Sequence, residues 1–232
     1  MFKAFFVIIL LTLSSAISAA VHVQEKIITI HGFLGASWNM YYLGRVLEAE
    51  KMTVSHWSYP SREKKIQAHA EDLVRQLQQE ALQNPGRTIH FLTHSMGGLV
   101  LRAAINHPGC PSEAKKGKAV LLAPPNQGAF WGRYLGKWAI ANFVGKDQAG
   151  MELMTELNFE HLGAFPNTMD VLVIAGNQSL NKLIPGENDG SVTVAETYLT
   201  TPHRHVVIQA EHHTILFCKD AGNLTKWFFL DP

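Results

Sequence analysis

Cysteine is scarce in this sequence, with only Cys110 and Cys218 among 232 residues. So few cysteines exclude a disulfide-rich scaffold, in which several bridges replace a hydrophobic core. The two thiols could pair in an oxidising compartment, but the sequence does not show whether they are close, and two buried free thiols are an equal expectation. The fold must therefore rest on its core, for which 47% of hydrophobic residues is ample.

An excess of charge of either sign is also missing. Lys and Arg number 20 against 19 for Asp and Glu, which gives a formal net charge of +1. The sequence has no basic stripe, so electrostatic binding of nucleic acid is not expected. It also has no internal repeat, low-complexity tract or long linker, and therefore predicts a single domain.

Long hydrophobic runs are absent except at the N-terminus. Residues 1–20 read MFKAFFVIILLTLSSAISAA, with Lys3 before an apolar run and small residues after it. The run is shorter than the roughly 20 residues that a spanning helix needs. This layout is typical of a cleavable secretory signal peptide. We therefore expect residues 1–20 to be a signal peptide, residues 21–232 to form one domain, and the protein to be secreted or periplasmic.

Strand-like and helical patterns alternate along the rest of the chain. The predicted strands cover residues 26–31, 52–60, 87–93, 117–125, 170–175 and 205–208, and the predicted helices residues 37–50, 66–82, 97–106 and 216–229. Several strands are continuous apolar runs, as in parallel sheets that are covered on both faces. The pattern predicts an α/β fold with about six mostly parallel strands, whose ligands bind at the carboxyl ends of the strands.

The strand at residues 87–93 ends in Thr-His-Ser-Met-Gly-Gly, and helical spacing begins at once. A nucleophile elbow, G-x-S-x-G, has this layout, because its sharp turn exposes a Ser at the start of a helix. Gly97 fits the second glycine position, whereas Thr93 stands in the first. The partial positive charge of the helix N-terminus favours an activated nucleophile. Ser95 is therefore the candidate nucleophile, with an ordinary helix N-cap as the alternative.

A nucleophilic Ser needs a base, and the chain has 12 His residues to choose from. His31 is better placed to shape the turn after the first strand, and His94 adjoins Ser95 and cannot easily point back at it. His212 and His213 lie in the loop after the last strand, where the chain order Ser, acid, His places the base. Between these two, the motif context favours His213.

The base needs a carboxylate to orient it. Asp189 lies in the turn ENDG between the fifth and sixth strands, where it could hold the imidazole tautomer and stabilise the imidazolium. Asp170 opens its strand and therefore lies at the wrong end of the sheet. Glu187 and Glu196 are the alternatives.

Acyl transfer also needs donors for the developing oxyanion. The backbone N–H of Met96, directly after Ser95, is one candidate. The turn HGFLGAS after the first strand offers the other, for which we expect the N–H of Phe33.

The motifs IHGFLG, YPSR, HFLTHSMGG, LAPPNQG and HHTILF, in this order, resemble the small bacterial esterase and lipase branch of the α/β-hydrolase superfamily. The resemblance covers nearly the whole chain after residue 25. It implies a minimal α/β-hydrolase fold with helices on both faces, and Ser95, Asp189 and His213 as the triad. It also implies hydrolysis of carboxylic esters. We further expect a small-molecule or lipid ester as substrate, transient contact with a lipid surface, and no cofactor or metal.

Residues 126–167 lie where such folds insert a cap. Within them, Phe130, Tyr134, Trp138 and Ala141 share one helical face. This face would either overhang the nucleophile and bind an acyl chain, as a lipase lid does, or pack on the sheet, which aromatic stripes do more often.

Three other functions remain open at this point. An acyltransferase, or a thioesterase or amidase, would use the same triad. A non-catalytic binding protein is a less favoured alternative, because all the expected catalytic roles are filled. A metallohydrolase is weaker still, since His203, His205, His212 and His213 lack a ligand spacing such as H-E-x-x-H.

Overall fold

The computed structural model describes residues 25–136 and 148–231. The predicted signal peptide, together with Trp138 and Ala141 of the aromatic stripe, lies outside the described residues. No helix within the two described ranges is long and apolar enough to cross a membrane.

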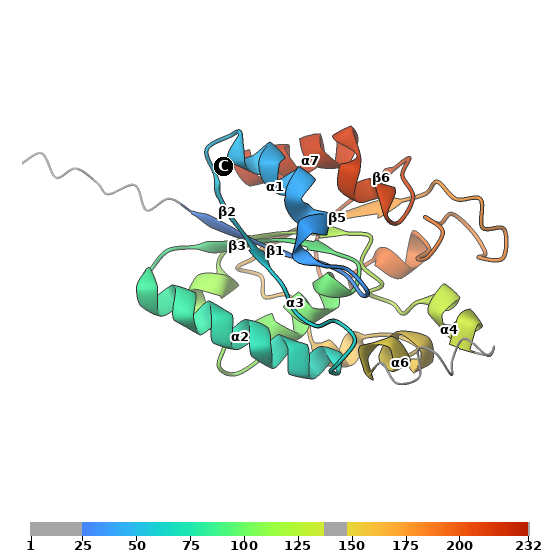
Figure 1. The fold of residues 1–232 in the computed structure, drawn as a ribbon, viewed down its shortest axis with the longest axis horizontal. Coiled ribbons are helices and arrows are strands. Elements are labelled where there is room, and N and C mark those ends of the chain that lie inside the picture. The colour runs from blue at the N-terminus through green and yellow to red at the C-terminus, as the bar shows by residue number, and fades with distance from the viewer. Residues whose placement is uncertain (1–24, 137–147, 232) are drawn as a thin grey trace, which may run out of the picture.

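A six-stranded sheet in the order β2-β1-β3-β4-β5-β6 forms the centre of the molecule (Figure 1). The strands are β1 (Lys26–Ile30), β2 (Thr53–Trp57), β3 (Ile89–His94), β4 (Lys118–Leu122), β5 (Asp170–Gly176) and β6 (Arg204–Ile208). Every neighbouring pair is parallel. The predicted α/β fold with six strands is therefore confirmed, and all its carboxyl ends meet at one edge.

Helices cover both faces of the sheet. Figure 1 shows α1 (Tyr41–Glu48) and α7 (Lys219–Leu230) on one face, and α2 (Ile66–Gln83) and α3 (Met96–Asn106) on the other. Alternate strand residues feed two separate cores, as the two-residue period of a strand requires. Ile28 packs with residues of α2 and α3, whereas its neighbour Ile27 packs with residues of α1 and α7.

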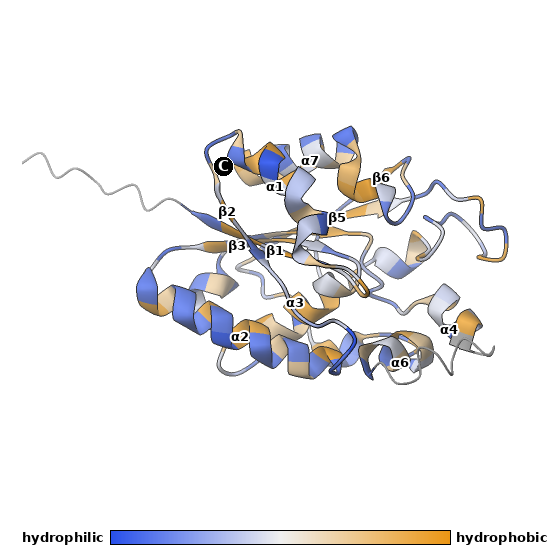
Figure 2. Ribbon diagram, in the orientation of Figure 1, coloured by the Kyte–Doolittle hydropathy of each residue, from blue (hydrophilic) through white to orange (hydrophobic). Residues whose placement is uncertain are grey.

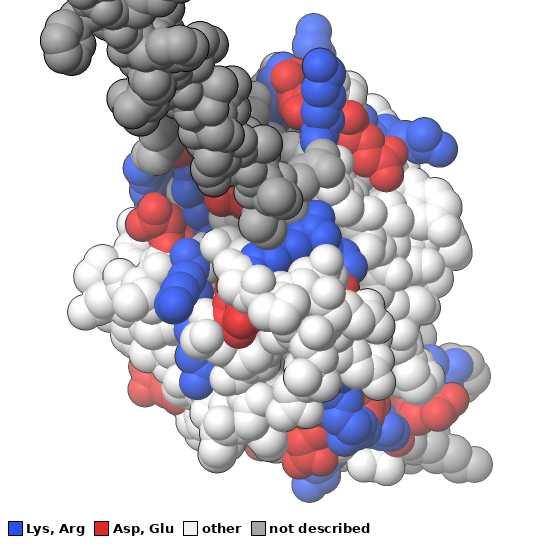
Figure 3. All heavy atoms as spheres, turned by 90° about the vertical axis from the view of Figure 1, so that its left-hand side faces the viewer, with Lys and Arg blue, Asp and Glu red and all other residues white. Residues whose placement is uncertain are grey.

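Amphipathic spacing explains why the outer helices adhere. In α2 the buried apolar side chains recur at helical intervals, at Ile66, Ala70, Leu73, Val74 and Leu77. Figure 2 shows the result as an apolar stripe toward the sheet and a hydrophilic outer side. On the face that Figure 3 shows, acidic and basic side chains are interspersed.

Two short helices lie at the edge of the sheet where the strands end. These are α4 (Phe130–Gly136) and α6 (Gln148–Thr155), which lie together in Figure 1. A Cβ at Gly132 would lie 2.6 Å from the carbonyl oxygen of Leu153, so glycine permits the close approach of α4 and α6. The remaining elements are the 3-10 turns η1 (Ser37–Met40), η2 (Ser112–Lys115), η3 (Glu160–Leu162), η4 (Ala195–Thr197) and η5 (Thr214–Phe217).

Candidate active site

Ser95 occupies a strained turn between β3 and α3. Its backbone has φ 52° and ψ −126°, a conformation that costs a non-glycine residue on the order of 1–3 kcal/mol. The turn is held from β4, because the Ser95 N–H donates to the carbonyl oxygen of Leu122 at 2.8 Å. Strain of this kind concentrates at functional sites, and here it lifts the Ser95 side chain away from the strand.

Close packing around the turn explains its glycines. A Cβ at Gly97 would lie 2.6 Å from the carbonyl oxygen of Ile30 in β1, which excludes any other residue without a backbone shift. A Cβ at Gly98 would lie 3.3 Å from the Oγ1 of Thr93. Gly98 thus makes room for the branched side chain that stands where a nucleophile elbow usually has glycine.

A line of three side chains connects Ser95 to a buried carboxylate. His212 Nε2 lies 3.0 Å from Ser95 Oγ, and His212 Nδ1 lies 2.7 Å from Asp189 Oδ2. A carboxylate only accepts, so Nδ1–H is the donor to Asp189, and this leaves Nε2 to accept from the Ser95 hydroxyl. This arrangement is that of a nucleophile, a base and an orienting acid.

The prediction of His213 as the histidine between Ser95 and Asp189 is wrong, because His212 takes that place. The His212 N–H donates to the carbonyl oxygen of Asp189 at 2.8 Å, and His94 Nε2 lies 2.8 Å from the carbonyl oxygen of His212. These two contacts fix the backbone of His212 so that its ring faces Ser95. The ring of the following residue, His213, lies 5.2 Å from that of His212, centroid to centroid, at the mouth of the site.

His94 supports the site from beneath. Burial, followed by the charge of His212, holds the pKa of His94 well below its usual value. A neutral His94 must carry its proton on Nε2, because the carbonyl oxygen of His212 can only accept. His94 therefore holds the loop that carries His212. Its side chain does not point at the neighbouring Ser95.

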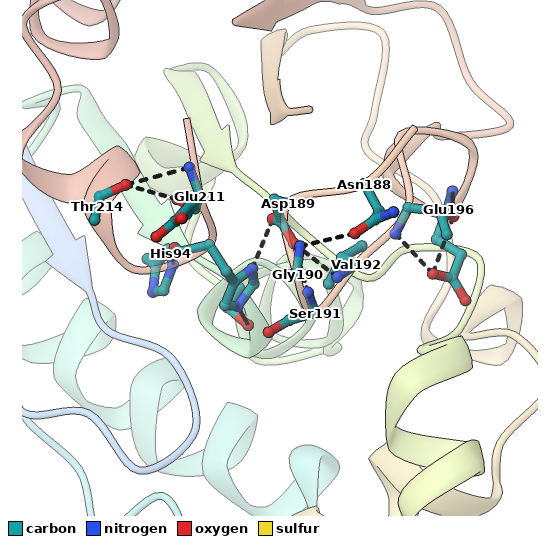
Figure 4. A network of polar contacts seen from close by, with 12 residues as sticks. His94, Asn188, Asp189, Gly190, Ser191, Val192, Glu196, Glu211 and Thr214 are labelled. Carbon is teal, nitrogen blue, oxygen red and sulfur yellow. Dashed lines mark hydrogen bonds and ion pairs between the residues drawn. The ribbon is translucent and has the colours of Figure 1, made fainter. Parts of the chain in front are cut away.

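Asp189 is fixed by its own turn. It is 2% exposed, and its Oδ1 accepts from the N–H groups of Ser191 (2.9 Å) and Val192 (2.8 Å). Figure 4 shows this turn with Asn188, whose Oδ1 accepts from the Gly190 N–H at 3.0 Å. With one oxygen held by the backbone, the other is directed at His212.

The alternative acids lie elsewhere. Buried Glu196 accepts from the N–H and hydroxyl of Thr193, both at 3.0 Å, and from Arg133 at 3.4 Å, so it joins the acid turn to α4. Glu187 is exposed, and Asp170 is exposed at the opening of β5, at the opposite end of the sheet.

Two backbone N–H groups remain candidates for the oxyanion. Met96 is the first residue of α3, where an N–H has no acceptor within its own helix. Phe33 and Ser95 line the same cavity. Both predicted donors thus belong to segments that meet at the nucleophile.

The loop that carries Phe33 is held by the segment after β2. Leu34 has φ 58°, and its N–H donates to the Oγ of buried Ser61 at 3.1 Å. The Tyr59 hydroxyl donates to the carbonyl oxygen of His31 at 2.9 Å, and the two rings stack with centroids 4.4 Å apart. Burial lowers the pKa of His31, so His31 acts in this turn as a neutral ring, in agreement with the shaping role expected of it.

An apolar cavity of about 300 Å³ opens over Ser95. Helices α4 and α6 supply much of its wall, with Trp131, Leu135, Leu153 and Met154. Part of residues 126–167 therefore overhangs the nucleophile. The α4 residues that face the cavity are Trp131 and Leu135, each one position after Phe130 and Tyr134 of the expected stripe. Phe130 of that stripe lines a different hollow, beside Arg133.

Outside this site, the described histidines and cysteines form neither a metal centre nor a disulfide. Among residues 25–136 and 148–231, no group of three His, Cys, Asp or Glu side chains could hold a metal ion. His205 stacks on Tyr198 with centroids 3.9 Å apart, and its Nε2 lies 2.8 Å from Thr197 Oγ1. Cys110 and Cys218 are free thiols, and burial raises the pKa of Cys110 to about 11.

Comparison with known proteins finds relatives by structure but not by sequence. No family model matches the chain, and no curated protein matches its sequence. The mature form of the Bacillus licheniformis lipase BlEst2 superposes with a TM-score of 0.71 at 21% identity, over 90% of this chain and 91% of that one.

Two further structures extend the likeness. Phospholipase PlaB from Legionella pneumophila gives a TM-score of 0.64 at 15% identity, over 89% of this chain and 58% of that one. A Xanthomonas campestris protein described as an α/β-superfamily hydrolase gives 0.58 at 11% identity, over 90% and 99%. The chain therefore has the α/β-hydrolase fold, and its structural relatives include a bacterial lipase and a bacterial phospholipase.

Proposed function

We propose that this protein is a serine hydrolase that cleaves carboxylic esters through an acyl-enzyme. The observation that carries the proposal is the hydrogen-bonded line from Ser95 through His212 to Asp189, with Ser95 in a strained turn. The apolar cavity above Ser95 suits an acyl chain, and the structural relatives named as a lipase and a phospholipase agree with the proposal.

Acylation begins with Ser95 Oγ attacking the ester carbonyl carbon while its proton passes to His212 Nε2. The carbonyl π electrons move to oxygen, and the oxyanion is stabilised by the N–H groups of Phe33 and Met96. Each such donor contributes on the order of 10²–10³ in kcat. The tetrahedral species then reforms its C=O bond and expels the alcohol oxygen, which takes the proton from His212.

Deacylation repeats the same steps with water. His212 Nε2 takes a proton from water as its oxygen attacks the acyl carbon, and the Ser95 oxygen leaves with that proton. Asp189 stays a carboxylate throughout and stabilises the imidazolium. The products are one carboxylic acid and one alcohol for each water consumed.

Localisation and lipid contact belong to the same proposal. Residues 1–20 have the layout of a secretory signal peptide, which supports a secreted or periplasmic protein. Leu34, at the rim of the apolar cavity, and Trp38, in the same loop region, are 66% and 62% exposed. Such apolar side chains beside the site favour transient contact with a lipid surface that holds the substrate.

The test is active-site labelling with a fluorophosphonate, followed by mass spectrometry of the adduct. We expect one label, on Ser95, that is lost in His212→Ala and kept in the matched control His213→Ala. Ester turnover should fall by about 10⁶ in Ser95→Ala, as when a triad nucleophile is removed. A folded protein that takes no label would instead support a non-catalytic binding function, and product analysis with added alcohols or amines would reveal acyl transfer.

A further inference from the structure

A second cavity adjoins His212. It measures about 260 Å³ and is lined by the loops after β5 and β6, which contribute several polar side chains and the apolar Leu180. We call it the polar cavity; its lining residues include Ser179, Asn181, Ser191, Glu211 and His213. Figure 4 shows Glu211 and the turn from Asp189 to Ser191 on neighbouring loops.

The polar cavity and the apolar cavity share Ser191, His212 and His213 in their walls. Ser95 lines the apolar cavity together with the side chains of α4 and α6. An ester carbonyl placed over Ser95 therefore directs its acyl chain into the apolar cavity. Its alcohol oxygen must approach His212 Nε2 for protonation, and the remainder of the alcohol then continues over His213 toward the polar cavity.

Hydrogen-bonding groups in the polar cavity suit hydroxyls. Asn181 Oδ1 accepts from the Leu183 N–H at 3.1 Å, while its Nδ2 makes only a long 3.5 Å contact to the carbonyl oxygen of Gly190, so the NH₂ group retains donor capacity. Ser179 Oγ accepts from the Asn181 N–H at 2.9 Å and retains its own hydrogen. Burial, followed by the charge of His212, lowers the pKa of His213, which leaves a neutral ring able to donate or accept near pH 7.

The charge of the lining argues against anions. Its carboxylates are Asp189 and Glu211, and no Lys or Arg among the described residues lines it. A phosphate in this cavity would lie beside the Glu211 carboxylate without a cation in the wall. Lys182 follows Asn181 in the chain and is exposed, so it is the basic residue to test as a rival influence.

We propose that the polar cavity is the leaving-group subsite, that it accepts a neutral polar alcohol such as glycerol, and that Glu211 makes it discriminate against alcohols that carry a phosphate. The inference rests on the proposed ester hydrolysis, since a leaving group exists only if Ser95 is acylated. It assigns Glu211 a role in specificity and leaves the chemical steps to Ser95 and His212.

The experiment compares two substrates with one acyl chain, 1-octanoylglycerol and 1-octanoylglycerol 3-phosphate, at equal monomer concentration. We expect kcat/KM to favour the neutral ester, and Glu211→Gln to reduce this preference about five-fold, because a nearby exposed carboxylate repels a phosphate by about 1 kcal/mol. The reduction should weaken at 1 M salt, where screening acts over about 3 Å. Glu71→Gln, an exposed carboxylate on α2, is the matched control and should leave the preference unchanged.

Four results would overturn the inference. The first is an unchanged preference in Glu211→Gln, and the second is a wild-type preference for the phosphate ester. The third is a preference that changes in Lys182→Gln but not in Glu211→Gln. The fourth is an equal loss for glyceryl and ethyl octanoate in Asn181→Leu, which should slow only the glyceryl ester. Fluorophosphonate labelling of each variant separates these results from a failure of the proposed function, in which no variant, nor the wild type, would label or cleave either ester.

Discussion

Replacing Asp189 with Asn is the sharpest test of how His212 is oriented. The side chain keeps its shape, but one of its two oxygens becomes an NH₂ group. Asp189 Oδ1 accepts from the N–H groups of Ser191 and Val192, so in the variant the remaining oxygen must stay there. The NH₂ group is then directed at His212 Nδ1, 2.7 Å away, which must become an acceptor.

The consequence is the wrong tautomer of His212. With Nδ1 accepting, the ring proton sits on Nε2, which can no longer take the proton of Ser95 Oγ. Loss of this kind costs about 10⁴ in kcat when the geometry is preserved. The fold should survive, because both N–H bonds of the acid turn are kept, whereas Asp189→Ala would leave two N–H groups without an acceptor.

The assay is steady-state hydrolysis of p-nitrophenyl octanoate, with the melting temperature as a control for folding. We expect kcat to fall about 10⁴-fold with KM changed less than three-fold, since the acyl cavity is untouched. A variant that melts like the wild type but keeps kcat within ten-fold would refute the orientation of His212 derived from Asp189.

Three further predictions concern the loop that carries Phe33, the apolar cavity and His94. Ser61→Ala removes the acceptor of the Leu34 N–H, so kcat should fall about ten-fold with little change in KM, as expected for one lost hydrogen bond. Ser61→Thr keeps a hydroxyl and should restore most of the lost kcat. Equal losses of kcat in both variants would contradict a positioning role for Ser61. Leu153→Trp fills part of the apolar cavity, so kcat/KM for octanoyl esters should fall at least ten-fold relative to acetyl esters, and an unchanged acyl-length profile would place the chain elsewhere. Because burial lowers the folded-state pKa of His94 below its usual 6.5, its contribution to stability is present above pH 6.5 and is lost as the pH falls below that value. The melting temperature should therefore decrease from pH 7.5 to pH 5. This decrease should be smaller in His94→Gln.

The strands could be predicted because the residues of each strand themselves indicate that it is buried. Continuous apolar runs such as KIITI and KAVLL suit a two-sided sheet, and β1 and β4 lie within the ranges expected for them. The start of the final helix could not be predicted in this way. Apolar spacing runs on through Ile215 and Leu216, yet these residues form η5, and Cys218 is extended with ψ 129° before α7 begins at Lys219. No Gly or Pro marks that break.

The candidate site likewise has residues that the sequence identifies and one that it does not. The side chains of Ser95 and Asp189 are placed by turns of a few residues, which the sequence displays directly. The choice between His212 and His213 has no local signal, because two identical side chains follow one another in a loop. It is decided by contacts across 118 and 23 positions, from His94 and from Asp189 to His212.

Thr93 shows how a departure from a motif can be compensated without loss of its geometry. The glycine that an elbow usually has two residues before its Ser gives room for the following helix. In this chain Thr93 fills that space and is fully buried, and the room is supplied instead from the helix side by Gly98, whose missing Cβ would lie 3.3 Å from Thr93 Oγ1. Gly97 allows no such exchange, because its neighbours are the carbonyl oxygens of Ile30 and His31 in the backbone. The second glycine of the elbow is thus required by the fold, whereas the first is one of two ways to separate a strand from its helix.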